Sequence, residues 1–134
     1  MILDDLLKLA DAQESTVSVA STSYIDTIAA GDSYEGAWLH VRVDTAITAS
    51  GSATVNFALQ TDDDSTFPSA TTLVETGAVA KAVLVAGKEY KIRIPPGAER
   101  YLRGYVTIAS GPLLTGKWDM FIVKDVDMGG QQLA

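Results

Sequence analysis

The sequence predicts an all-β protein of about eight strands with little helix, folded as an antiparallel β-sandwich or small barrel. Three observations support this fold class. Short segments rich in Val, Ile, Thr and aromatic residues alternate between apolar and polar side chains, which is the period of a strand. Gly, Pro, Asp and Ser residues, which favour turns, separate these segments at short intervals. The chain of 134 residues suits one domain, and no block of its sequence repeats.

The first segment, residues 1–14, differs from the rest of the chain. Apolar residues recur in it at helical spacing, with charged residues between them: Ile2, Leu3, Leu6, Leu7 and Leu9. This spacing is compatible with a short amphipathic helix that packs on its own domain. It is also compatible with an extended arm whose leucines dock on a neighbouring subunit, because a terminal segment is ordered only when something holds it. The sequence leaves both interpretations open.

The strands follow along a sandwich domain that we place at residues 15–125. His40 lies on the polar, solvated face of its strand, opposite the inward Leu39 and Val41. Since no acid or nucleophile is visibly paired with His40, we interpret it as a solvated strand residue. The predicted strands are residues 16–20, 24–28, 38–44, 53–61, 71–76, 79–85, 90–94, 101–109 and 116–124.

The turn after residue 94 and the last strand are the most informative local signals. Pro95 and Pro96 fix φ and remove two N–H donors, and Gly97 supplies the positive φ of a type II turn. The strand 116–124 carries apolar residues on both faces, which predicts a central or covered strand. Residues 126–134 show no periodicity, and we expect a loose tail there.

Composition excludes several classes of protein. The chain has no cysteine and one histidine, which rules out disulfides, thiolate zinc sites and sites with several imidazoles from one chain. A formal net charge of −7 disfavours nucleic acid as a partner. The longest apolar run, residues 78–86, is interrupted by Lys81 and is too short to span a membrane. Asp4 and Asp5 stand where an export signal would carry basic residues, so none is expected.

No catalytic motif is present, and we predict no catalytic, cofactor-binding or metal-binding residue and no enzyme activity. The run Asp62–Asp64 suggests calcium, but the spacing of a calcium-binding loop is missing, and we interpret it as a charged turn. A pair of carboxylates that meets across a sandwich leaves no sequence signature, so this one route to an enzyme stays open.

Four sequence elements occur in a characteristic order over nearly the whole chain. They are a leucine-rich start followed by DAQ at Asp11–Gln13, STSYID at Ser21–Asp26, FALQTDDDSTF at Phe57–Phe67 and IPPGAERYLR at Ile94–Arg103. In their order and spacing the chain resembles the cement, or head-decoration, proteins of tailed bacteriophages. None of the four elements is a catalytic signature.

The resemblance implies a jelly-roll β-sandwich that binds the outside of an assembled capsid. In this role the protein bridges neighbouring major capsid protein subunits, forms a homo-oligomer and resides on the virion exterior after synthesis in the host cytoplasm. Exposed apolar residues at edges and termini are where such a partner is expected. The contact candidates are Ile2, Leu3, Leu6 and Leu7 in the first segment, Leu113 and Leu114 before the last strand, and Val126 and Met128 in the tail.

The alternative function is a carbohydrate-binding module on a virion or cell surface. Two tryptophans and five tyrosines are available to line a face on which sugar rings stack. The competing explanation is that these aromatic residues form the core of a small sandwich. The sequence does not decide between them.

Overall fold

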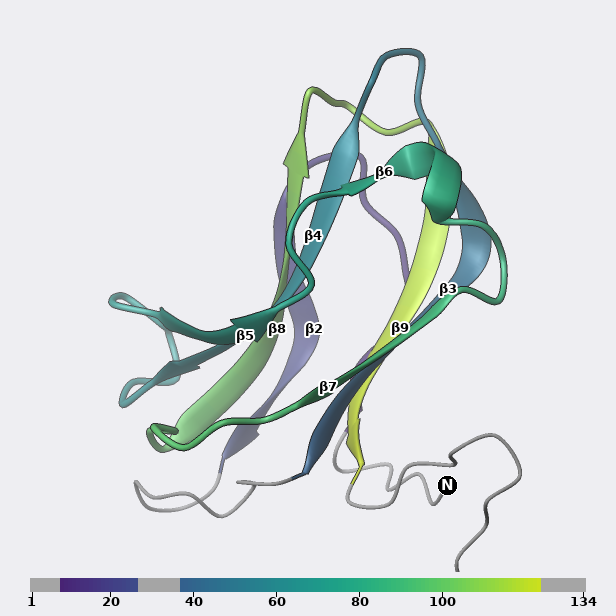
Figure 1. The fold of residues 1–134 in the computed structure, drawn as a ribbon. Helices are drawn as coiled ribbons and strands as arrows, with labels where there is room; N and C mark the ends of the chain where they lie inside the picture. The colour runs from purple at the N-terminus through teal and green to yellow at the C-terminus, as the bar shows by residue number, and fades with distance from the viewer. Residues whose placement is uncertain (1–7, 27–36, 124–134) are drawn as a thin grey trace, which may run out of the picture.

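The computed structural model describes residues 8–26 and 37–123, and these residues form two antiparallel sheets packed face to face (Figure 1). The elements are β1 (Lys8–Gln13), β2 (Val19–Asp26), β3 (Trp38–Thr48), β4 (Thr54–Asp62), β5 (Thr71–Glu75), β6 (Val79–Ala80), the 3-10 helix η2 (Lys81–Val83), β7 (Glu89–Arg93), β8 (Tyr101–Ala109) and β9 (Thr115–Val123). The predicted antiparallel β-sandwich is therefore confirmed. Among the described residues, no helix is long and apolar enough to cross a membrane.

The strands pair in a nested order around the loop at residues 63–70. β4 pairs with β5, β3 with β7, β2 with β8, and β1 with β9. One sheet, sheet A, has the order β1-β9-β3-β7, and the other, sheet B, has the order β2-β8-β4-β5 with β6 beside β4. The chain is thus one long antiparallel hairpin rolled into two layers, which is the connectivity of a jelly roll.

The core lies between the two sheets and is built by the alternation read from the sequence. Trp118, Met120 and Ile122 point inward from β9 and are fully buried. They meet Phe57 of β4, whose ring lies 5.8 Å from that of Trp118 in an edge-to-face contact. On β8, Gly104 lets Met120 approach, because a Cβ atom there would lie 2.8 Å from the Met120 Cε. The sheets therefore pack closely at this point.

Two expectations about local structure are wrong. Residues 8–13 form β1, whose Leu9 is fully buried in the core, so the segment expected to be an arm or helix over 1–14 is part of the sandwich from Lys8 onward. The strand expected at 79–85 consists of the short β6 followed by η2. Val79 packs against the core and Leu84 is buried in it, whereas Val83 and Val85 are exposed, so beyond β6 the segment closes one end of the sandwich rather than extending a sheet.

The interruption expected at 21–23 does not separate two strands, because β2 is continuous from Val19 to Asp26, whereas the turn expected after Ile94 is present. The break at 21–23 is a register shift within β2, and Ser21 stabilises it by accepting a hydrogen bond from the Gly104 N–H at 2.9 Å. The turn after Ile94 has the positive φ of 114° at Gly97. The turn residues after Ile94 were therefore interpreted correctly.

Four loops meet at one end of the sandwich. The loops at 14–18, 49–53, 81–88 and 110–114 lie together at the end drawn at the top of Figure 1, which we call the loop end. Backbone hydrogen bonds join these loops to one another and to β3: Leu113 N–H donates to Thr16 O, Leu114 N–H to Thr48 O and Ile47 N–H to Leu84 O. The loop end is therefore a connected part of the fold.

Candidate interaction surfaces

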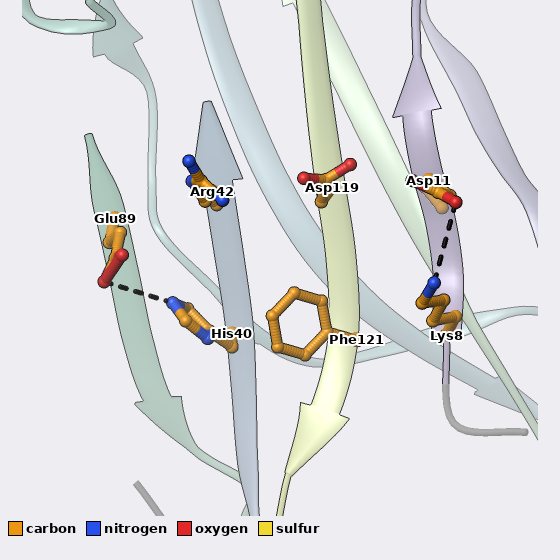
Figure 2. A pocket seen from close by; sticks show the side chains of 8 residues that line it. Lys8, Asp11, His40, Arg42, Glu89, Asp119 and Phe121 are labelled. Atoms are coloured by element: carbon orange, nitrogen blue, oxygen red, sulfur yellow. Dashed lines mark ion pairs between the residues drawn. The ribbon is translucent and has the colours of Figure 1, made fainter. Parts of the chain in front are cut away.

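A hollow of about 210 Å³ lies on the outer face of sheet A and crosses all four of its strands (Figure 2). Phe121 of β9 occupies its middle, with charged side chains on both sides. The lining residues are Lys8, Ala10, Asp11, His40, Arg42, Glu89, Asp119 and Phe121. Neighbouring strands place these side chains together because their residues alternate in register on one face.

His40 is the one buried ionisable base of this hollow, and its predicted solvent exposure is wrong. Only 2% of its surface is exposed. Its ring packs edge-to-face against Phe121 with centroids 4.6 Å apart, and its Nε2 lies 3.3 Å from the Glu89 Oε2. The alternation of β3 correctly placed His40 on the outer face, but a strand pattern does not reveal whether that face is covered.

Most charged groups around the hollow have partners within the fold. The Asp119 Oδ1 accepts a hydrogen bond from the Ala12 N–H at 2.6 Å, which holds the irregular strand β1 against β9. Lys8 and Asp11 form an ion pair at 3.6 Å. These contacts give the carboxylates structural roles. Among the described residues, no group of three or more metal-ligating side chains is placed to hold a metal ion.

The burial of His40 predicts a pH-dependent stability. Desolvation lowers the pKa of His40 and outweighs the opposing effect of Glu89. The unfolded chain therefore takes up a proton at a higher pH than the folded chain, and the free energy of unfolding falls as the pH decreases from above the ordinary histidine pKa to below the lowered one. The charged groups facing this region are Glu89 and Lys91 on β7, Arg42 on β3, Asp119 on β9, and Lys8 and Asp11 on β1.

We expect His40→Gln to reduce this pH dependence. Urea unfolding at several pH values between 5 and 8 measures it, and the slope of stability against pH should be smaller in the variant than in the wild type. Asp44→Asn, at an exposed position on the same strand, is the control and should leave the slope in this pH range unchanged. Equal slopes for His40→Gln and the wild type would contradict the prediction.

A second surface, the arginine–aromatic cluster, lies on the outer face of sheet B. We define it by Tyr24, Phe67, Tyr101, Arg103 and Tyr105. The Arg103 guanidinium lies 4.4 Å from the ring centroid of Phe67 and 5.3 Å from that of Tyr105. Tyr24, which is 51% exposed, makes edge contacts with Tyr101 at 5.6 Å and Phe67 at 6.3 Å. The rings and the guanidinium thus support one another on the surface.

The third surface is apolar and lies at the loop end. Four of the five exposed large hydrophobic side chains among the described residues are found there: Val17 (60% exposed), Val83 (46%), Val85 (54%) and Leu114 (63%). A shallow hollow lined by residues 14–16 adjoins Leu114. We call these four residues the apolar loop end. Their gathering at one end is the kind of exposed apolar surface that marks an interaction site.

The contact candidates chosen from the sequence fall into three groups. Leu114 is exposed in the apolar loop end. Leu113 is 2% exposed and belongs to the core, so it does not offer a contact surface; adjacent leucines in a turn point in opposite directions, which the sequence did not resolve. The remaining candidates lie outside the described residues: Ile2, Leu3, Leu6, Leu7, Val126 and Met128.

Three contributors to the apolar loop end were missed. Val17 was placed in a strand, although it lies in the loop before β2. Val83 and Val85 were placed in the strand expected at 79–85. The sequence signal that could have found Val83 and Val85 is their spacing of two residues around Leu84, which puts both valines on the side opposite that leucine.

The Asp62–Asp64 run is a structural loop, as interpreted. The buried Asp62 carboxylate accepts hydrogen bonds from the Ser69 N–H at 2.8 Å and the Asp64 N–H at 3.2 Å. Although desolvation favours its neutral form, these hydrogen bonds lower the pKa of Asp62. The Asp64 carboxylate accepts from the Thr66 N–H at 2.9 Å. Local side-chain to backbone bonds of this kind shape turns.

A comparison with protein families assigns the described sandwich to one of them. A family model described as Bbp16 matches residues 9–122, which runs from β1 to β9. The family name indicates a phage-related protein. No curated protein matches the chain.

Proposed function

This chain belongs to the Bbp16 family, and we propose that it is a structural protein of a phage virion that binds the outside of the assembled capsid. It stabilises the shell by bridging neighbouring major capsid protein subunits, and it catalyses no reaction. Binding only to the assembled shell stabilises that state by mass action. Copies held by a repeating lattice gain avidity that no single contact supplies.

The apolar loop end is the observation that carries this proposal. A monomeric soluble protein has little reason to gather its exposed large apolar residues at one end, whereas a binding protein needs such a surface. Burying one Val or Leu side chain in an interface is worth about 1.5–3 kcal/mol. Hydrogen bonds between the loops hold these residues on a pre-organised surface, which reduces the entropy lost on binding.

The test uses mature capsids that lack this protein. We expect the purified wild-type chain to co-sediment with them and to raise their resistance to heat. The double variant Val17→Asp with Leu114→Asp should bind at least roughly 100-fold more weakly, because two charges replace apolar contacts worth about 1.5–3 kcal/mol each. Circular dichroism should show an intact fold, since both positions are exposed.

The control variant Val17→Ile with Leu114→Met keeps both side chains apolar and should bind as the wild type does. Equal binding by the two double variants would show that the apolar loop end does not contact the capsid. Failure of the wild-type chain to bind any capsid would reject the proposed function itself.

The alternative, a carbohydrate-binding module, finds less support in the arginine–aromatic cluster. Stacking of a sugar requires a free ring face, and the guanidinium groups of Arg100 and Arg103 already cover one face of Tyr101 and Tyr105 respectively. A glycan array with the full chain is the direct test. A saturable signal that is lost on Tyr24→Ala would favour the carbohydrate function instead.

A further inference from the structure

We propose that the arginine–aromatic cluster is a second docking site, which binds a carboxylate-bearing segment of a protein partner. The inference rests on the proposed function, because it names a further contact through which the chain would bridge two shell subunits. It concerns a different surface from the apolar loop end. The cluster lies on the outer face of sheet B, whereas the apolar loop end lies where the strands of both sheets terminate.

Arg103 is the centre of the proposed site because its guanidinium is held in place. It lies 4.4 Å from the Phe67 ring centroid and 5.3 Å from the Tyr105 ring centroid. Its Nε donates a hydrogen bond to the Gln60 Oε1 at 2.9 Å. These contacts engage one edge and the flat face of the group. The planar fork is thereby fixed before a ligand arrives, which reduces the entropy lost on binding.

The charge of Arg103 lacks a counter-charge within the described part of the chain. Its neighbour Arg100 shows the contrast, since it binds the Asp26 carboxylate through Nε at 2.8 Å and Nη2 at 3.0 Å. Among the described residues, no carboxylate forms an ion pair with Arg103. Arg93 forms no ion pair among the described residues either, but the guanidinium of Arg103 is also held by Gln60 and two aromatic rings, so it is both fixed and available to a carboxylate from outside.

The surrounding residues indicate a protein partner. Tyr24 is 51% exposed and is the cross-strand neighbour of Arg103, and the ring of the half-buried Tyr105 lies 5.3 Å from the Arg103 guanidinium. Tyr and Arg are the residue types enriched where protein interfaces concentrate their binding energy. An Asp or Glu side chain on a partner would accept two hydrogen bonds from the fork while its backbone packs against Tyr24. The tyrosine hydroxyls would form hydrogen bonds with the N–H and C=O groups of that backbone.

Two docking surfaces that face different directions explain how one rigid body bridges two subunits. A single surface binds one partner at a time and leaves neighbouring subunits unconnected. The apolar loop end contacts one subunit through its exposed Val and Leu residues, and the cluster contacts an acidic segment on the next subunit. Occupying both sites joins the two subunits through the core of the sandwich.

The first experiment compares two arginines in the capsid-binding assay. Arg103→Ala should weaken binding roughly tenfold to a hundredfold, the range expected when a hydrogen-bonded charge is lost. Arg103→Lys should also weaken binding, because an ammonium cannot form the two-pronged contact. The matched control is Arg93→Ala: Arg93 stacks over Trp38 at 5.8 Å on sheet A, so the control removes the same charge and a similar ring contact. Arg93→Ala should bind within twofold of the wild type.

The second experiment identifies the partner group. A carbodiimide couples the amine introduced by Arg103→Lys to a carboxylate in contact with it, and peptide mapping of the adduct should find an Asp or Glu of a shell protein attached at position 103. The same treatment of Arg93→Lys should give no adduct at position 93.

The outcomes separate this inference from the proposed function. If the wild type binds capsids and Arg103→Ala binds equally well, the docking site is rejected and the function stands. If the wild type binds no capsid, the function fails before the arginines are compared. An adduct at position 103 on an acidic sugar also overturns the inference, as does the absence of an adduct there at concentrations where Arg103→Lys co-sediments with the capsids.

Discussion

Replacing Trp118 with alanine is expected to lower the free energy of unfolding by about 3–5 kcal/mol. Trp118 is 0% exposed and points inward from β9, the strand that joins β1 to β3 in sheet A. Its removal leaves a cavity beside Phe57 and ends the edge-to-face contact at 5.8 Å. Because β9 is flanked by strands on both sides, the surrounding structure has little freedom to collapse into that cavity.

Urea unfolding followed by circular dichroism measures this loss without relying on tryptophan fluorescence. Trp38→Ala is the matched control, since Trp38 is half-buried on the outer face of the same sheet and stacks under Arg93. Removing it should cost less than half as much as removing Trp118. An equal loss in the two variants would show that burial between the sheets does not set the stability.

Gly116→Ala is the second substitution with a large expected effect, about 2–4 kcal/mol of destabilisation. Gly116 has a φ of 145°, which residues with a side chain rarely adopt. A Cβ atom there would also lie 2.7 Å from the Ile47 Cγ1 and 3.2 Å from the Ile47 Cα. Because the second of these atoms belongs to the backbone of β3, a side-chain rotation cannot relieve the overlap.

Thermal unfolding of Gly116→Ala and Gly51→Ala tests this expectation. Gly51 lies in the loop between β3 and β4, and a Cβ atom there would be at an ordinary 3.8 Å from the Ser110 O. Gly51→Ala should therefore change the free energy of unfolding by no more than about 0.5 kcal/mol. A Gly116→Ala variant as stable as Gly51→Ala would mean that β3 shifts freely at its end.

The inner and outer faces of the long strands could be predicted from the sequence. In β8, Leu102 and Val106 point inward and Tyr105 points outward, because backbone geometry alone fixes this alternation. The burial of His40 could not be predicted, since it depends on Phe121 and Glu89, which come from other strands. Alternation assigns a side chain to a face of the sheet but does not show what lies against that face.

The order of the strands and the composition of the surfaces also depended on contacts between distant residues. Alternation along the strand predicted at 101–109 puts Arg103 on the face opposite Leu102, but its partner Phe67 belongs to the loop between β4 and β5, and nothing local in the sequence connects the two. The apolar loop end likewise combines residues from three loops. Leu113 was misjudged because a turn residue faces the core or the solvent according to the backbone path around it.

The nested pairing of the strands has a consequence for biosynthesis. Ala12 and Asp119, which are joined by a hydrogen bond, lie 107 residues apart in the chain. Sheet A requires β9 between β1 and β3, and sheet B requires β8 between β2 and β4. A nascent chain therefore cannot complete sheet B before β8, or sheet A before β9, has left the ribosome. Until then, the edges of the earlier strands remain unpaired.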